Sequence, residues 1–225
     1  MLCIYCGERK ATTRDHVPPK CFFSTPRPNN LITVPCCEVC NTKYGKDDER
    51  VRNIVTSLAT TEGHPAIKEQ IAGKRDKSYT RVEGISNFQH IVESLKIVAR
   101  YTPGGIYLGQ APAFNLDQPT IDRFVERIAR ALLYQEIAME HTACDFEWKM
   151  SPDDAALDRM PPDIKAVLYG KPKVIGEGVF SYVGYFLSGT ASSLWFLNFY
   201  GGIDFMVRVS DKSHRSGRAE RNLTQ

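Results

Sequence analysis

The chain has 225 residues, of which 42% are apolar, and its formal net charge is only +3. This composition predicts a globular protein with a buried core, and it restricts any binding of polyanions to a local surface. The sequence holds no apolar run of the roughly eighteen residues that a membrane span needs, and residues 1–10 lack the apolar centre of a signal peptide. We therefore expect a cytoplasmic protein that does not associate with membranes.

The first part of the chain predicts two short strands followed by a helix. Residues 12–17 have the composition of a strand and stop at a pair of prolines, which have no backbone N–H to donate. Residues 24–30 contain two more prolines and predict a loop, and residues 31–34 predict the second strand. After Cys37 the apolar residues recur at helical spacing, which predicts a helix with one buried face.

The middle of the chain is predicted to be mostly helical. A short helix is expected at residues 64–72, and a second apolar stripe runs from Phe88 to Ala99 before a Pro-Gly-Gly sequence. The strongest helical pattern covers residues 119–138. Its buried face is expected to consist of six apolar side chains: Ile121, Phe124, Val125, Ile128, Leu132 and Leu133.

The opposite face of that helix carries Arg123, Arg127 and Arg130. Such a row can follow a phosphate backbone. Charges on the polar face of an amphipathic helix are more often solvated surface, and the neighbouring Asp122 and Glu126 dilute the positive charge. We therefore interpret this row as solvated.

The last third of the chain changes to strand patterns. Strands are expected at residues 144–150, 174–187, 192–199 and 203–209, and a turn at 200–202 predicts a hairpin between the last two. Residues 155–168 predict a helix that is interrupted by two prolines. The whole is an α+β protein in which helices are followed by an antiparallel sheet.

Three segments are expected from this pattern. Residues 1–60 form a small N-terminal module, residues 61–211 form an α+β domain, and residues 212–225 form a basic, disordered tail suited to loose electrostatic attachment.

Four of the seven cysteines form two pairs with two-residue spacers, Cys3 with Cys6 and Cys37 with Cys40. Two such pairs close a tetrahedral zinc site with Zn–S bonds of about 2.3 Å. The alternative is a set of buried free thiols, since cysteine behaves as a small apolar residue. Cys36 competes with Cys37 as a ligand, but only Cys37 keeps the two-residue spacer.

An adjacent Asp15-His16 pair lies between the cysteine pairs, and Asn41 follows the last cysteine. This constellation resembles the zinc-stapled branch of the HNH nucleases, members of the ββα-metal (His-Me finger) superfamily. The resemblance extends over residues 1–60. The family pattern is filled in order by eight residues: Cys3, Cys6, Asp15, His16, Asn30, Cys37, Cys40 and Asn41.

The resemblance implies a role for each residue of the pattern. The four cysteines would hold a structural zinc, and His16 would accept a proton from the attacking water. Asp15 and Asn41 would hold a catalytic Mg²⁺ or Mn²⁺, and Asn30 would fix the loop that carries the histidine. The family achieves the convergence of Asp15 and His16 by a distortion of the strand, since successive strand residues face opposite sides.

Alternatives remain for several of these positions. Asn29 is placed as well as Asn30, and Asn41 can instead cap the start of a helix. Tyr44 stands where the family often has a lysine.

The resemblance implies an endonuclease that hydrolyses phosphodiester bonds in DNA. RNA is an alternative substrate, because metal-assisted hydrolysis does not use the 2′-hydroxyl. A non-catalytic zinc-stapled module that binds nucleic acid is the other reading.

Overall fold

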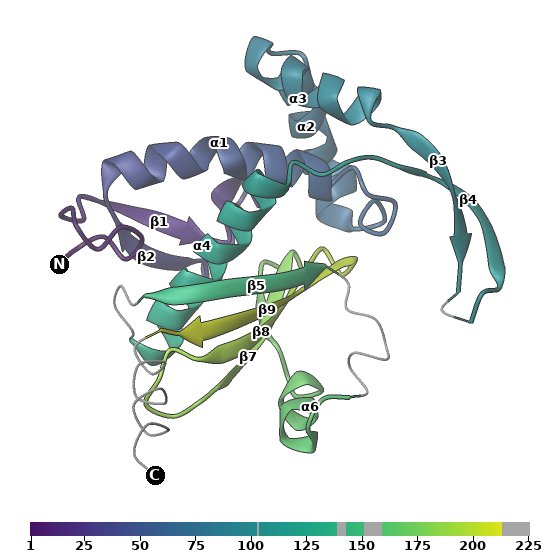
Figure 1. Ribbon diagram of the computed structural model, residues 1–225. Helices are drawn as coiled ribbons and strands as arrows, with labels where there is room; N and C mark the ends of the chain where they lie inside the picture. The colour runs from purple at the N-terminus through teal and green to yellow at the C-terminus, as the bar shows by residue number, and fades with distance from the viewer. Residues whose placement is uncertain (103, 139–142, 151–158, 213–225) are drawn as a thin grey trace, which may run out of the picture.

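The computed structural model describes residues 1–102, 104–138, 143–150 and 159–212 (Figure 1). It shows a mixed α+β fold in which every paired strand is antiparallel to its neighbour. Two sheets have two strands each, and the third has five. The predicted α+β class is therefore confirmed. Across the described residues, none of the helices combines the length and the apolar character needed to cross a membrane.

The N-terminal part has the predicted order of strand, strand and helix. Strands β1 (Thr13–Val17) and β2 (Ile32–Cys36) pair with each other and are joined by a loop that contains a 3-10 turn at Lys20–Phe22. Helix α1 (Glu38–Val55) follows and packs against β1.

The middle of the chain differs from the predicted arrangement. A π-helical turn at Ile67–Ile71 leads into α2 (Ala72–Tyr79), which is followed by α3 (Val82–Glu93). Strands β3 (Lys96–Tyr101) and β4 (Tyr107–Ala113) then form a hairpin.

The prediction of one helical stripe from Phe88 to Ala99 was therefore wrong. The helix ends at Glu93, and the β-branched Ile97 and Val98 pair with strand β4 instead.

Helix α4 (Gln118–Ile137) lies between the N-terminal part and the C-terminal sheet (Figure 1). It contacts α1, β2 and β9. All six residues predicted for its buried face are buried. The prediction of a solvated arginine row was wrong at Arg127, whose side chain is only 1% exposed, because α4 is covered on more than one side.

The C-terminal sheet has the strand order β5-β9-β8-β7-β6. The single strand predicted at 174–187 is two strands separated by a turn. The five strands of the sheet are β5 (Cys144–Met150), β6 (Lys173–Ile175), β7 (Phe180–Phe186), β8 (Ser193–Phe199) and β9 (Ile203–Asp211). Buried residues alternate along β8 and β9, as expected for a sheet with one covered face.

Helix α6 (Pro162–Leu168) precedes this sheet's β6 strand. Part of the helix predicted at 155–168 and nearly all of the predicted tail, residues 213–225, lie outside the described residues.

One hydrophobic core joins the N-terminal and C-terminal parts. The ring of Phe22 lies 5.6 Å from that of Phe124 and 5.4 Å from that of Phe199, between ring centroids. The Tyr200 hydroxyl donates a hydrogen bond of 2.6 Å to the Phe22 carbonyl. The predicted boundary near residue 60 stays a prediction, and packing is continuous across it.

Candidate functional site

The four predicted cysteine ligands come together at the start of α1. The sulfur atoms of Cys3, Cys6, Cys37 and Cys40 all lie within 4.8 Å of one another. A tetrahedral zinc with bonds of about 2.3 Å separates its sulfur ligands by about 3.8 Å, so the four sulfurs are close enough together to share one ion. Gly7, with φ of +65°, provides the left-handed turn that closes the first pair. This group can hold a metal ion such as zinc.

Positive charge and a helix start favour the thiolate form of Cys37, whereas burial raises the pKa of Cys40 to about 12. The backbone N–H of Cys40 donates to the Cys37 sulfur at 3.5 Å, where Cys37 caps α1. The Arg9 guanidinium donates to the sulfurs of Cys37 at 3.4 Å and Cys40 at 3.9 Å. Burial opposes ionisation of Cys37, yet these donors outweigh it and lower the pKa of Cys37 to about 6. Arg9 was not identified from the sequence. The only indication of its role in the sequence is that it is a cation close to the first cysteine pair.

Cys36 stays outside the cluster. Its thiol donates to the Cys37 carbonyl at 3.3 Å, and burial raises the pKa of Cys36. The neutral thiol of Cys36 therefore behaves as a small core residue, as Cys21 and Cys144 do.

His16 lies on the outer side of the β1–β2 hairpin, directly opposite Thr33. Its side chain is half-buried. Burial lowers the pKa of His16, and the charge of Lys20 lowers it further. The carboxylate of Asp15 raises this pKa, whereas the charges of Arg27 and Arg14 lower it. The histidine thus has three cationic neighbours on or beside the hairpin.

Asp15 faces the opposite way, into the protein, where it is 5% exposed. Its Oδ2 atom accepts a 2.6 Å hydrogen bond from the Tyr5 hydroxyl and lies 3.6 Å from Nε of Arg127. Its Oδ1 atom accepts the backbone N–H of His16 at 2.8 Å. Both carboxylate oxygens are therefore already engaged by protein groups.

The expected strand distortion is not found between Thr13 and Val17, where the register to β2 is continuous. A regular strand directs successive side chains to opposite faces, so Asp15 and His16 do not converge. Asn41 lies on α1 above the inner face, and its amide donates to the Thr13 hydroxyl at 3.3 Å.

Asn30 is placed differently from the family pattern. Its amide donates to the Val174 carbonyl of β6 at 2.9 Å, which ties the loop before β2 to the C-terminal sheet.

The cation beside Asp15 is Arg127, which sequence reasoning assigned to the solvent. Its Nη2 atom lies 2.6 Å from Oδ1 of Asp48, and its guanidinium lies 5.0 Å from the centre of the Tyr44 ring. Burial raises the pKa of Asp48 to about 6 despite the adjacent guanidinium. Burial opposes the charge on Arg127 as well, but the carboxylates of Asp48 and Asp15 outweigh it and raise the pKa of Arg127. Arg127 is thus the cation of a buried network between α1, β1 and α4.

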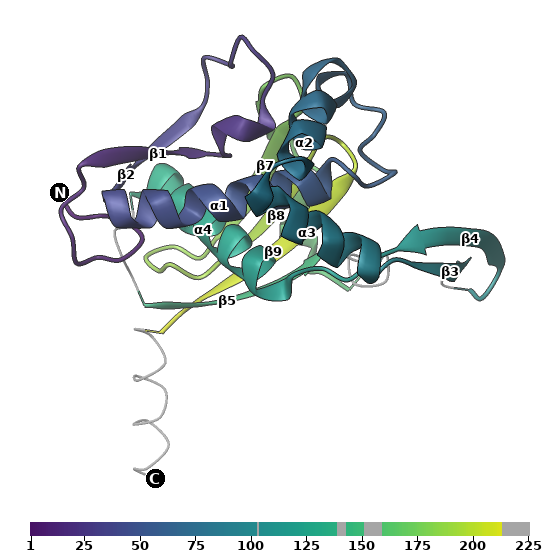
Figure 2. The same cartoon turned by 90° about the horizontal axis from the view of Figure 1, so that it is seen from above.

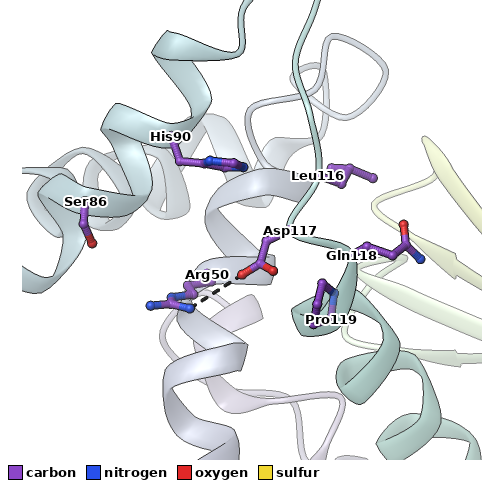
Figure 3. A pocket seen from close by; sticks show the side chains of 7 residues that line it. All are labelled: Arg50, Ser86, His90, Leu116, Asp117, Gln118 and Pro119. Atoms are coloured by element: carbon purple, nitrogen blue, oxygen red, sulfur yellow. Dashed lines mark ion pairs between the residues drawn. The ribbon is translucent and has the colours of Figure 1, made fainter.

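A cavity of about 410 Å³ lies elsewhere, between α1, α3 and the segment before α4 (Figure 3). Arg50 and Asp117 meet at this cavity with an N···O distance of 3.6 Å. Its other lining residues are Ser86, His90, Leu116, Gln118 and Pro119. None of the residues predicted for the catalytic site lines it.

Comparison of the chain with protein-family models, with curated proteins and with solved structures finds no match. The findings define the molecule as a mixed α+β protein with a four-cysteine group that can bind a metal ion.

Proposed function

We propose that this protein is an endonuclease of the HNH type, which hydrolyses phosphodiester bonds in DNA with His16 as the general base. The observation that carries the proposal is the position of His16. It lies among three cations on the outer face of a hairpin, and the helix that follows this hairpin begins at the four-thiol cluster.

The cations suit the charge of the substrate. A phosphodiester carries one negative charge that increases at the non-bridging oxygens during attack by water. Arg14 is held in place by two hydrogen bonds to the Thr33 hydroxyl, at 3.0 Å and 2.7 Å, so its charge is positioned in advance. Lys20 and Arg27 add mobile positive charge near the same imidazole. A phosphate bound here would lie next to the ring nitrogen that accepts the water proton.

The thiol cluster has a structural role in this proposal. Four thiolates are the donor set of a closed zinc site, which leaves no coordination position for a substrate. The metal would fix the N-terminal loop against the start of α1, and the β1–β2 hairpin is attached to both.

A catalytic divalent ion is a separate question, and the residues first assigned to it do not fit one in this arrangement. Mg²⁺ retains several water molecules and needs carboxylate oxygens that face open space. Both oxygens of Asp15 are engaged by Tyr5, Arg127 and a backbone N–H, and the side chain is buried. We therefore derive no catalytic step through an ion at Asp15 and Asn41.

The decisive experiment is cleavage of plasmid DNA and of RNA by purified protein, with and without Mg²⁺ or Mn²⁺. His16→Ala should lower the cleavage rate by about 10²- to 10⁴-fold, the usual contribution of a general base. Zinc content and DNA affinity should stay near those of the wild type. His90→Ala is the matched control, since His90 is an exposed histidine on α3 away from the hairpin, and it should cut at the wild-type rate.

A His16→Ala protein that cuts as fast as the wild type would remove the catalytic claim. The engaged state of Asp15 favours a second candidate, a zinc-stapled module that binds nucleic acid without cutting it. Under that candidate, the wild type binds DNA through the cations around His16 but leaves the plasmid intact in every metal condition.

A further inference from the structure

A single arm, residues 82–113, projects from the rest of the molecule. It consists of α3 followed by the β3–β4 hairpin, and it lies at the end opposite to β1 and β2 (Figures 1 and 2). All six residues of β3 are exposed. The hairpin is thus a two-stranded ribbon with little cover, which is marginally stable in water when alone.

The exposed surface of this arm is mainly apolar. Of the eighteen large apolar side chains that are exposed in the described part of the chain, eleven belong to the arm. They are Val82, Ile85, Phe88, Val92, Leu95, Ile97, Val98, Tyr101, Ile106, Tyr107 and Leu108. An apolar surface this concentrated is unusual on a monomer and indicates an interaction site.

The pattern is ordered on both elements of the arm. On α3, Val82, Ile85 and Val92 recur at helical spacing, so the helix turns an apolar stripe to the solvent. On the ribbon, the rings of Tyr101 and Tyr107 lie 5.6 Å apart on one face.

Charge and area both fit a protein partner. The part of the arm that follows α3, residues 94–113, contains no aspartate or glutamate and only two cations, Lys96 and Arg100. Few charges together with exposed tyrosines is the composition of an interface core. If each of the eleven side chains exposes about half of roughly 200 Å², the arm offers on the order of 1,000 Å², close to the ~800 Å² that each partner buries in a standard interface.

The two strands of the ribbon differ in their free edges. Strand β4 contains Pro112, which has no N–H, and Gly109 with φ of +98°. Strand β3 contains neither proline nor glycine. Its edge therefore offers uninterrupted backbone donors and acceptors, which pair readily with another strand.

We propose that the arm is a dimerisation surface on which β3 pairs antiparallel with β3 of a second copy. A two-fold axis normal to the sheet makes each contact reciprocal. Centring the axis on Ala99 places Ile97 opposite the partner's Tyr101, a favourable pair of β-branched and aromatic side chains. It also places Arg100 opposite the uncharged Val98 of the partner. An axis centred on Val98 would instead place two cations, Lys96 and the partner's Arg100, opposite each other. The result is a four-stranded sheet across the dimer.

This arrangement leaves the proposed catalytic hairpin uncovered. The arm and the β1–β2 hairpin lie at opposite ends of the molecule, so both copies keep an open His16 face (Figure 1). The proposal does not depend on nuclease activity, and its tests do not use cleavage.

The first test measures mass by light scattering during gel filtration. The wild type should have the mass of two chains at about 50 µM, because interfaces of this size bind with micromolar or tighter affinity. Ile97→Glu places a charge in the centre of the interface and should weaken the dimer by about 30-fold or more. Leu187→Glu, an equally exposed apolar residue outside the arm, is the matched control and should remain dimeric. Unchanged circular dichroism and zinc content show that each variant is folded.

The second test probes the two-fold axis. Residues directly opposite in an antiparallel pair have Cα atoms about 4.5–5.5 Å apart, within disulfide range. Ala99→Cys should therefore form a covalent dimer when treated with oxidised glutathione. Gln110→Cys is the control, because Gln110 lies opposite Ala99 on β4. In the dimer, both copies of β3 lie between Gln110 of one chain and Gln110 of the other. That places the two added cysteines about 14 Å apart, beyond disulfide range.

A wild type that is monomeric at 50 µM would overturn the proposal, as would an Ile97→Glu protein whose dimer dissociates, in a dilution series, at the same concentration as the wild-type dimer. Equal cross-linking of the two cysteine variants would overturn the pairing of β3 with β3. A monomer whose arm variants lose affinity for DNA would replace the second copy with nucleic acid as the partner of this surface.

Discussion

The N-terminal ββα region and the C-terminal sheet are held together by different forces. The C-terminal sheet alternates buried apolar residues along β8 and β9, with Trp195 and Phe199 fully buried in its core. The ββα region has a sheet of only two short strands. Four thiols lie at one end of α1, and Arg127 of α4 pairs with Asp48 of α1 and Asp15 of β1.

The two regions should therefore unfold in response to different substitutions. Apolar burial acts without a cofactor and depends little on neighbouring charges. Thiolate ligation and a buried ion pair depend on single atoms, because removal of one partner leaves the other uncompensated. Substitutions that target these groups should therefore affect the ββα region far more than the sheet.

The largest effect is expected from loss of one zinc ligand. Cys37→Ser should abolish tight zinc binding, and a structural zinc supplies on the order of 10 kcal/mol to the folding of a small module. Metal analysis after dialysis against a weak chelator should show about one zinc in the wild type and little in the variant. Hydrogen exchange should report a loosened ββα region together with a protected C-terminal sheet.

Cys36→Ser is the control for this experiment, since Cys36 is buried beside the cluster without belonging to it. It should retain zinc. Retention by Cys37→Ser and loss by Cys36→Ser would move the fourth ligand to Cys36.

A smaller but substantial loss is expected from the buried ion network. Arg127→Met keeps the volume of the side chain but leaves Asp15 and Asp48 without their cation, which should lower the free energy of unfolding by about 3–5 kcal/mol. Arg208→Met on β9 is the control. Arg208 pairs with Glu147, and both side chains are more than half exposed, so its loss should cost about 1 kcal/mol or less. Urea denaturation measures both values, and equal losses would contradict the structural role of Arg127.

Asp15→Asn tests the same network from the other side. If Asp15 serves Arg127 and Tyr5, the variant unfolds at a lower urea concentration than the wild type in a zinc-containing buffer without Mg²⁺ or Mn²⁺, and the binding of Mn²⁺ to the protein is unchanged. A variant that is as stable as the wild type in that buffer but has lost a Mn²⁺ site would restore Asp15 as an ion ligand.

The smallest expected effect concerns Arg9. Its guanidinium donates to two of the four sulfurs, and loss of a group that hydrogen-bonds a metal ligand typically costs 10- to 100-fold in metal affinity. Because Arg9 is exposed, Arg9→Ala should lie at the low end, near 10-fold. Competition with a chromogenic chelator measures the affinity, and Lys10→Ala should leave it unchanged. An Arg9→Ala protein with wild-type affinity would show that the backbone donors suffice.

Local patterns in the sequence predicted much of this architecture. Strands β1 and β2 follow from β-prone composition and neighbouring prolines, and α1 and the buried face of α4 follow from a period of 3.6 residues. All of these are properties of short segments. The cysteine cluster follows from the spacing within each pair. The prediction of a helix up to Ala99 failed because Leu95 and Ala99 happen to continue the helical spacing of apolar residues. The β-branched Ile97 and Val98 indicate the strand that is found there, β3.

The surroundings of the proposed site could not be predicted in this way. The contact of Asp15 with Arg127 joins residues more than a hundred positions apart, and a helical pattern cannot show which side of α4 a second layer covers. The orientation of Asp15 also depended on whether β1 is regular, which only the register with β2 decides. The contact of Asn30 with β6 could not be predicted either, because only tertiary packing brings Val174 to it.

The hydrogen bond from Tyr200 to the Phe22 carbonyl has a consequence for synthesis on the ribosome. Residue 22 is translated long before residues 199 and 200, which supply aromatic rings and the hydroxyl that cover it. At about 5–20 residues per second, the nascent N-terminal segment waits on the order of ten to thirty seconds for these partners. During that interval Phe22 is exposed on an incomplete chain, and chaperones that bind apolar segments have their opportunity to engage it. The hairpin that contains Tyr200 is thus the element that closes the core around Phe22.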